Sequence, residues 1–219
     1  MKGMMKDLEE VFRQNQIPVF GTAAASALET EAFGYRPSDV LENVRTVLCI
    51  GVPVPRGIFL ARAESEALYW RAANVYYRAI DAVLMKAAAV VEDSGETAVA
   101  VFGCFPYTLV GRGNFRGLVS LVAMGEAAGI GKRGRNGLLF SSRYGPRLLV
   151  GGLVTSAELS PETWPQREEA GCPTDCRVCQ QECPAGAIDS EGRVDGPSCA
   201  KRSTGSPIFS TFMKTLKPP

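Results

Sequence analysis

The chain has 219 residues, with 24 Lys and Arg, 23 Asp and Glu, seven Cys and no His. The absence of histidine excludes a Ser-His-Asp or Cys-His nucleophile system and any metal site that uses imidazole. A hydrophobic content of 46% and a net charge of +1 are typical of a globular protein and give no general attraction to nucleic acid or membranes. The length predicts one or two domains, at about 150 residues each.

The N-terminal segment predicts a cytoplasmic protein. It reads MKGMMKDLEEVFRQNQ, which is charged and lacks the apolar stretch of a signal peptide. The longest uncharged, apolar-rich run, 98–111, is shorter than the roughly 18 residues that a membrane helix needs, so no membrane partner is expected. Clustered cysteines in a cytosolic chain bind a metal more often than they form disulfides.

The first quarter of the chain alternates helical and extended patterns. Residues 5–16 carry apolar side chains at helical spacing and predict a first helix, whereas residues 16–25 contain proline and glycine and are expected to be extended. Ser38 is expected to cap a short helix that continues to Val44. Residues 46–52, TVLCIGV, are apolar and rich in β-branched side chains, which predicts a buried strand.

The clearest helical pattern covers residues 62–93, and Gly95 ends it. Apolar side chains recur in this segment at spacings of three and four, which predicts one buried face. The residues of this face are Leu68, Ala72, Val75, Ala79, Val83, Ala87 and Val90.

Strands and helices continue to alternate after this helix. Residues 98–105, AVAVFGCF, predict a strand, and residues 118–128 predict a helix of small residues that packs closely against a sheet. Residues 147–155, RLLVGGLVT, predict a second buried strand, whose glycine pair indicates a bulge or a close backbone approach. The mixture predicts α/β or α+β layers.

A domain boundary is expected at residues 160–171, which contain two prolines and several charges. This boundary separates a body, residues 1–160, from a small C-terminal module, residues 161–219. Residues 201–219 have no acidic residue and end in Lys-Pro-Pro, so we expect a loosely held tail.

Five of the seven cysteines lie in the C-terminal module: Cys172, Cys176, Cys179, Cys183 and Cys199. The first four are spaced C-x3-C-x2-C-x3-C-P, one residue longer in the first gap than the bacterial ferredoxin pattern. Closely spaced thiolates can wrap the corners of an iron–sulfur cube, and short gaps let backbone N–H groups point at the sulfides. The run therefore predicts a [4Fe–4S] cluster.

The fourth ligand of this cluster is either Cys183 or Cys199. In two-cluster ferredoxins the last Cys of a run serves the other cluster, but no second run follows here, and Cys183 is favoured because it is local. The alternatives for the run are a four-thiolate zinc site, a structural or disulfide role, and a radical S-adenosylmethionine site, whose usual aromatic residue is Val178 here. Cys49 and Cys104 lie in apolar strand candidates and are predicted to be core residues.

The segment from 111 to 156 is basic and rich in glycine. Glu126 is its only acidic residue, against seven Lys and Arg. A glycine loop with basic residues can expose backbone N–H groups to an anion such as phosphate. A tight connection with solvated arginines explains the pattern equally well, and a contact with nucleic acid lacks the interleaved aromatic residues that stack on bases. The glycines concerned are Gly129, Gly131, Gly134 and Gly137.

Residues 128–155 resemble the core signature of epoxyqueuosine reductases and their shorter relatives, a family related to reductive dehalogenases. They read AGIGKRGRNGLLFSSRYGPRLLVGGLVT. In that family a segment like A-G-L-G-W-I-G-K-N-G-L-L precedes Y-G-P-R and a strand that ends V-x-T, and a ferredoxin-type cysteine run follows, as it does here. The family's aromatic residue is replaced by Lys132 and its usual lysine by Arg135. The resemblance covers roughly residues 30–200.

The resemblance implies an α+β body with a nitroreductase-like, cobalamin-binding-type sheet and helices, joined to a ferredoxin-type module. It implies iron–sulfur clusters that pass single electrons to cobalt, and a two-electron reduction of the substrate. The family holds cobalamin without a protein histidine, which agrees with the composition. The residues that would line the cofactor pocket are Gly131, Gly134, Arg135, Asn136, Gly137, Leu138 and Tyr144.

No catalytic residue is assigned by the resemblance. The position of the family's acid falls at residues 114–116, where this chain has no carboxylate. A proton would have to come from another group, and Tyr107 and Tyr144 are the candidates.

Two functions remain open, one enzymatic and one not. The first is an iron–sulfur oxidoreductase that takes electrons from a soluble donor and delivers them beside the glycine loop. The acceptor is a cofactor, with cobalamin as the candidate, or a small-molecule or anionic substrate. The second is a non-catalytic iron–sulfur binding or redox-sensing protein, whose basic loop binds an anionic partner.

Overall fold

The computed structural model describes the chain at residues 2–30, 35–104, 107–110, 114–159 and 171–204. Its helices are α1 (Lys2–Gln14), the 3-10 helix η1 (Ala25–Leu28), α2 (Pro37–Val40), α3 (Arg56–Leu60), α4 (Ser65–Glu92), α5 (Leu121–Ala127), α6 (Val178–Gln181) and α7 (Gly196–Thr204). Its strands are β1 (Val19–Ala24), β2 (Thr46–Pro53), β3 (Ala98–Val101), β4 (Tyr107–Val110), β5 (Asn114–Gly117), β6 (Lys132–Arg133), β7 (Leu139–Phe140) and β8 (Leu148–Thr155).

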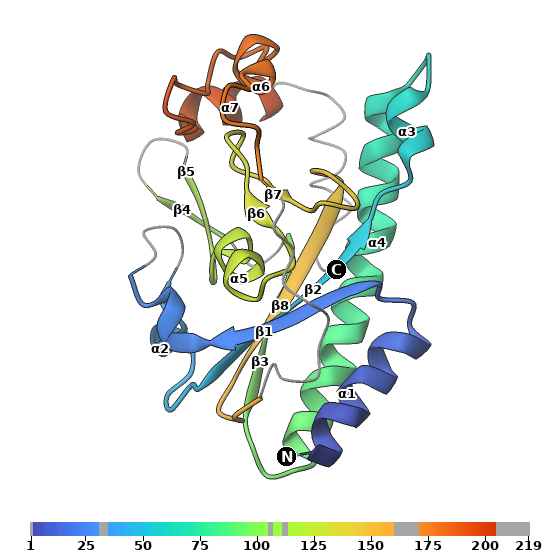
Figure 1. Cartoon of the computed structure of the whole chain (residues 1–219), viewed down its shortest axis with the longest axis vertical. Coiled ribbons are helices and arrows are strands. Elements are labelled where there is room, and N and C mark those ends of the chain that lie inside the picture. The colour runs from blue at the N-terminus through green and yellow to red at the C-terminus, as the bar shows by residue number, and fades with distance from the viewer. Residues whose placement is uncertain (1, 31–34, 105–106, 111–113, 160–170, 205–219) are drawn as a thin grey trace.

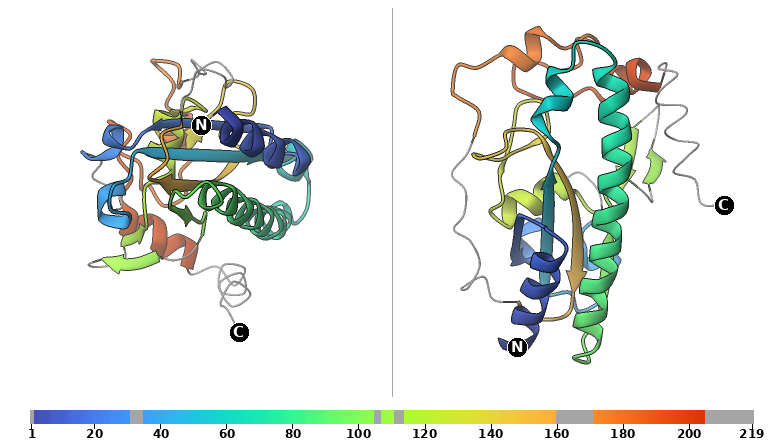
Figure 2. Two further views of the ribbon diagram at one scale, coloured as in Figure 1. Left: turned by 90° about the horizontal axis from the view of Figure 1, so that it is seen from below. Right: turned by 90° about the vertical axis from the view of Figure 1, so that its right-hand side faces the viewer.

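An antiparallel sheet forms the centre of the molecule (Figure 1). Within the described residues it has four strands in the order β1-β2-β8-β3. β2 and β8 pair along their whole length, from Thr46 opposite Thr155 to Pro53 opposite Leu148. Helices α1 and α4 cover one face and α5 packs on the other, while α6 and α7 lie beyond the end at which β8 begins (Figures 1 and 2). The prediction of an α+β body is therefore confirmed.

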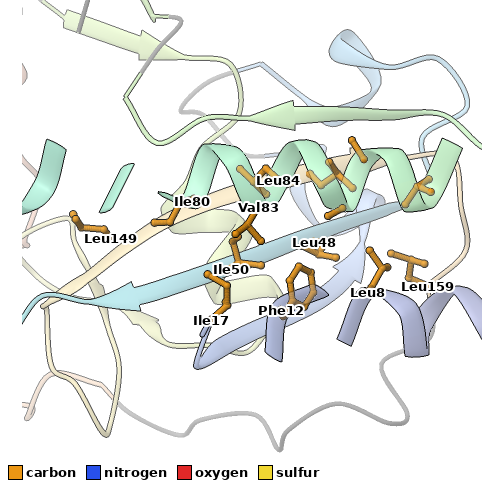
Figure 3. Close-up of a cluster of buried hydrophobic side chains, with 14 of the residues drawn as sticks. Leu8, Phe12, Ile17, Leu48, Ile50, Ile80, Val83, Leu84, Leu149 and Leu159 are labelled. Carbon is orange, nitrogen blue, oxygen red and sulfur yellow. The ribbon is translucent and has the colours of Figure 1, made fainter. Parts of the chain in front are cut away.

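The face of the sheet under α1 and α4 holds the first hydrophobic core. Leu48 and Ile50 of β2 point to this side, where they meet α1 and α4 (Figure 3). Burial of such side chains contributes roughly 1.5–3 kcal/mol each, and it is the main force that fixes the long helix on the sheet. The fully buried partners on the two helices include Leu8, Phe12, Ile80 and Leu84.

The opposite face of the sheet holds a second core under α5. Val47 and Cys49 alternate with Leu48 and Ile50 along β2 and face this side, because successive side chains of a strand point to opposite faces. Cys49 is fully buried there, so its prediction as a core residue is confirmed. The same core contains Ile130, which precedes β6, and Leu139 of β7. Around them lie Val119, Ala123 and Met124.

The glycine pair of β8 marks a close approach of helices to both faces and no bulge, since the register of β8 with β2 runs without interruption. A Cβ at Gly151 would lie 2.6 Å from Ile80 Cγ2 of α4. A Cβ at Gly152 would overlap the sulfur of Met124 in α5 and lie 3.0 Å from the Leu48 carbonyl oxygen. The two glycines therefore let α4 and α5 approach the sheet from opposite sides.

The buried face predicted for α4 is wrong in part. Val83 and Ala87 are buried as expected, but Leu68, Val75 and Ala79 are exposed. The larger side chains of Ile80 and Leu84 decide the rotation of the helix, because they fill the space beside the Gly151 backbone. Apolar side chains at spacings of three and four fit two neighbouring faces of α4 equally well. In the N-terminal half of the helix the predicted face is the one that is exposed.

Other element boundaries also differ from expectation. α2 begins after Arg36, whose backbone N–H donates to Asp39, and Ser38 lies inside the helix and donates to Glu29. β3 ends at Val101, so the predicted strand is too long at its C-terminal end. α5 begins only after Ser120, whose hydroxyl accepts the Ala123 N–H at 3.3 Å.

The expected boundary at 160–171 and the expected tail at 201–219 lie largely outside the described residues. None of the helices in the described part of the chain has the length and apolarity that a membrane crossing requires.

Candidate functional site

The β6–β7 hairpin carries most of the glycine-rich segment. Its tip is a tight turn in which the Gly134 N–H donates to the Leu138 carbonyl at 2.8 Å and the Gly137 N–H donates to the Gly134 carbonyl at 3.0 Å. Gly137 has a φ of +76°, a conformation that favours glycine. The Asn136 side-chain oxygen accepts the Leu138 N–H at 3.1 Å and closes the turn. Leu138 itself is 51% exposed.

Tyr144 lies in the turn that follows β7, at the opposite end of the hairpin from its tip. The turn is closed by paired backbone hydrogen bonds between Ser141 and Gly145. The Tyr144 side chain packs against the core under α5, and the Arg143 guanidinium lies 5.1 Å from its ring centre. The residues assigned by resemblance to the cofactor pocket thus occupy both ends of one hairpin.

The cysteine run surrounds the short helix α6. Cys172 and Cys176 precede it, Cys179 lies within it and Cys183 follows it. Cys183 Sγ accepts the Ala187 N–H at 3.4 Å. Backbone N–H groups, first those of Ala187 and Ala185, hold the pKa of the Cys183 thiol below its ordinary value. Such donors are what a thiolate ligand of an iron–sulfur cluster requires.

Cys199 stands apart from this run in α7. Its side chain is exposed, and its backbone N–H donates to the Asp195 carbonyl at 3.0 Å. None of the five cysteines from Cys172 to Cys199 forms a disulfide bond in the described part of the structure. Within the residues that the structure describes, no three Cys, Asp or Glu side chains are gathered closely enough to hold a metal ion. The donor chemistry nevertheless fits a cluster, since the thiols are unbridged and partly accessible.

The hairpin tip and the cysteine run are in direct contact. The Arg135 backbone N–H donates to Cys172 Sγ at 3.5 Å, and its guanidinium donates to the Thr174 carbonyl at 2.9 Å. A Cβ at Gly134 would lie 3.5 Å from Cys172 Sγ. The two motifs that the sequence presents separately therefore form one site at the end of the sheet.

Cys104 and two titratable side chains of α4 lie together beyond the end of β3. Burial raises the pKa of the Asp81 carboxyl to about 6, and its Oδ1 is buried without a hydrogen-bond partner among the described residues. Burial, with the negative charge of Asp81, raises the pKa of the Cys104 thiol to about 11. Burial also raises the pKa of Tyr77. Cys104 is half-buried and follows the strand, in contrast to its predicted place within it.

The second proton-donor candidate, Tyr107, is a residue of β4, and its side chain lies outside the described part of the structure. The position of the family's acid falls in β5, at 114–116. Of these three side chains, that of Arg116 is described, and its guanidinium lies 4.0 Å from the centre of the Tyr35 ring. At the position of the family's acid this chain thus has the cation of Arg116.

Sequence comparison relates the chain to two groups of reductases. Epoxyqueuosine reductase of Lactococcus garvieae is 29% identical over 177 residues, which are 77% of this chain and 46% of that protein. Epoxyqueuosine reductase of Listeria monocytogenes is 34% identical over 93 residues, 42% of this chain and 24% of that protein. Tetrachloroethene reductive dehalogenase of Dehalobacter restrictus is 39% identical over 82 residues, 36% of this chain and 14% of that protein. No protein-family model matches the chain.

Solved structures show the same two groups. Epoxyqueuosine reductase of Streptococcus thermophilus has a TM-score of 0.65 at 21% identity and covers 96% of this chain and 61% of its own. A reductive dehalogenase for which a B12-dependent mechanism has been suggested has a TM-score of 0.62 at 15% identity and covers 90% of this chain and 28% of its own. The chain is related to epoxyqueuosine reductases and reductive dehalogenases. The resemblance seen in residues 128–155 is confirmed.

Both groups of relatives are reductases, so the chain shares its fold with redox enzymes. It spans less than half the length of each of the three curated epoxyqueuosine reductases and reductive dehalogenases named above. The activity, substrate and partners of those whole proteins therefore do not transfer directly to this chain.

Three residues at the contact between the hairpin and the cysteine run were not predicted by the sequence analysis. Thr174 contributes a backbone carbonyl, which no sequence pattern marks. Arg177 donates from its guanidinium to that carbonyl and to the Cys176 carbonyl, each at 3.0 Å. Gly192 has a φ of +83°, and a Cβ there would lie 3.2 Å from Arg135 Cα. The separation of Gly192 from the hairpin along the chain hides this contact from any local signal.

Proposed function

We propose that the chain is an iron–sulfur oxidoreductase with a ferredoxin-type module at residues 161–219. Cys172, Cys176, Cys179 and Cys183 would hold a [4Fe–4S] cluster, and a soluble donor would reduce it. The acceptor, a cofactor or a small anionic substrate, would bind beside the β6–β7 hairpin. A bound cluster of this kind supplies one-electron transfer.

The observation that carries this proposal is the contact of Arg135 with Cys172. The hydrogen bond from the Arg135 N–H to Cys172 Sγ puts the hairpin tip against the first cysteine of the run. A group bound beside the tip would therefore lie next to a cluster ligand, which is what short-range electron transfer requires. The redox chemistry of the relatives named above supports the same assignment.

The backbone around the run supports thiolate ligands. The Ala187 N–H at Cys183 and the Arg135 N–H at Cys172 donate to sulfur from two sides of the segment. At Cys183 the backbone donors hold the pKa of the thiol below its ordinary value, and thiolates are the form that binds iron. We expect the four sulfurs to converge when the cluster assembles, because ligand binding and local folding are coupled in small metal modules.

A corrinoid is the second group that the family resemblance implies, together with a nitroreductase-like body. The three glycines assigned to the cofactor pocket, Gly131, Gly134 and Gly137, do not fit a cradle for it, since the protein's own atoms fill the space beside each of them. A Cβ at Gly131 would meet the Phe140 carbonyl at 2.8 Å, and one at Gly137 would meet Val194 Cγ2 at 3.3 Å. We therefore derive no step through a corrinoid.

The proposal is tested by anaerobic reconstitution of the whole chain with iron and sulfide, followed by reduction with dithionite. The expected result is a brown protein that gives the EPR signal of one reduced [4Fe–4S] cluster. A colourless protein that binds only zinc would overturn the proposal. Titration of the same sample with cobalamin tests the corrinoid separately, and an unchanged cobalamin spectrum agrees with the filled glycine positions.

Rate measurements separate the enzyme from a redox sensor. The reduced protein is mixed with artificial one-electron acceptors, and the reoxidation of its cluster is followed optically. Fast reoxidation that an inorganic anion slows supports an acceptor site beside the basic hairpin. A cluster that is reduced and reoxidised only over hours would favour the sensing function.

A further inference from the structure

Arg135 touches the cysteine segment with both its backbone and its side chain. The backbone N–H donates to Cys172 Sγ at 3.5 Å, and a terminal guanidinium nitrogen donates to the Thr174 carbonyl at 2.9 Å. These two acceptors lie on either side of Pro173, so the guanidinium is fixed over the start of the loop between Cys172 and Cys176.

Two glycines, Gly134 and Gly192, allow Arg135 and the cysteine segment to lie this close together. Gly134 is buried, and the Cys172 sulfur occupies the space beside its Cα. Gly192, at a φ of +83°, packs against the backbone and stem of Arg135, where a Cβ would lie 3.2–3.4 Å from its Cα, Cβ and Cγ. A side chain at Gly192 would press on Arg135, and a Cβ at Gly134 would lie 2.9 Å from the Asn136 side-chain oxygen within the hairpin tip.

The charge of Arg135 is not neutralised by a carboxylate. Among the described residues Arg135 forms no ion pair, and its Nε is buried without a hydrogen-bond partner. The Arg177 guanidinium donates to the same Thr174 carbonyl at 3.0 Å, which places a second cation at this loop. A buried, unpaired guanidinium nitrogen is costly unless an anion lies nearby. Four thiolates around an iron–sulfur cube form a group of net negative charge.

We propose that Arg135 is a positioning residue for the cluster: its N–H orients Cys172 as a ligand, and its guanidinium raises the reduction potential. This inference rests on the proposed function. A reduced cluster carries one more negative charge than an oxidised one, so a fixed cation nearby stabilises the reduced state. Arg135 thereby couples the hairpin, where the acceptor would bind, to the redox properties of the cluster.

The test compares the wild-type chain with R135Q, R135K and K132Q after anaerobic reconstitution. R135Q keeps the backbone N–H and loses the cation, whereas R135K keeps a cation. Lys132 is exposed in the same hairpin, so K132Q controls for the loss of one positive charge. The midpoint potential is measured by EPR-monitored redox titration, and iron is counted in every sample.

The expected result is a midpoint potential that shifts to lower values in R135Q, returns most of the way in R135K and is unchanged in K132Q. An R135Q protein that takes up no iron while R135K does would also support the inference, since a cation at this position is then needed to stabilise the negatively charged cluster. Equal potentials at equal iron content in wild type and R135Q would overturn it and leave the proposed function intact. A wild-type chain without a cluster would overturn both.

Discussion

The cysteines of this chain divide according to their surroundings. Cys49 is buried between strand and helix, and burial raises the pKa of its thiol to about 12. Cys183 receives backbone N–H donors, which hold its pKa below the ordinary value. The first environment keeps a thiol neutral and the second favours the thiolate. Cys183 is thus suited to bind iron and Cys49 to fill the core.

This contrast gives a prediction for the fourth ligand. C183A should lose most of the iron and the visible absorbance after reconstitution, because a local thiolate is removed from the run. C199A should keep both, because Cys199 lies exposed in α7 outside the run. Iron analysis of the two variants side by side is the measurement. The opposite pattern would make Cys199 the ligand.

Asp81 gives a prediction for stability against pH. Its folded-state pKa, about 6, lies above the ordinary 3.8, so the folded protein binds this proton more tightly than the unfolded chain does. The ionised carboxyl therefore costs stability once the pH rises above about 4, and the full cost is reached above about 6. D81N should gain about 1 kcal/mol at pH 7.5 after allowance for solvent screening, and almost nothing at pH 4.

Urea unfolding of wild type and D81N at these two pH values measures the difference. An equal effect of the substitution at pH 4 and pH 7.5 would show that the Asp81 carboxyl does not titrate differently on folding.

At the scale of elements, the sequence predicted the helices and strands of the central sheet in their chain order and the buried face of α1, with Leu8 and Phe12. The short strands β4 to β7 and the rotation of α4 did not follow from it. The pattern of TVLCIGV gave β2 directly, because a short apolar run rich in β-branched residues fits a strand buried on both faces. The rotation of α4 depends on where the backbone of β8 leaves space, at Gly151, and only the packed structure contains that information. A glycine pair in a sequence indicates that another element packs closely on the strand, but it does not show which element this is.

The glycines of the sheet give a prediction at this scale. G152A should destabilise the fold by about 1–3 kcal/mol, since the added methyl overlaps Met124 of α5 and the Leu48 carbonyl. G51A is the matched control in the neighbouring strand, where a Cβ would make ordinary contacts at 3.5–3.7 Å, and its effect should stay below about 1 kcal/mol. Thermal and urea unfolding measure both. Equal losses would mean that helix packing does not depend on Gly152.

At the scale of the whole molecule, two motifs that lie apart in the sequence, the glycine-rich segment and the cysteine run, come into contact in the fold. The cysteine spacing and the glycine-rich segment each predict a site, and family resemblance places them in one protein. Their contact is made by the Arg135 backbone N–H and the Cys172 sulfur, 37 positions apart, and nothing in the sequence indicates that these two groups meet. Residue types therefore predict the kind of chemistry that we propose, whereas the contact between the hairpin and the cysteine run became visible only in the fold.

The central claim is that the cysteine run holds one [4Fe–4S] cluster beside the β6–β7 hairpin. The most direct measurement is the iron, acid-labile sulfide and zinc content of the whole chain purified without air and without added metals. We expect iron and sulfide in equal amounts, close to four of each per chain, with little zinc. Zinc at one per chain, with no sulfide, would contradict it.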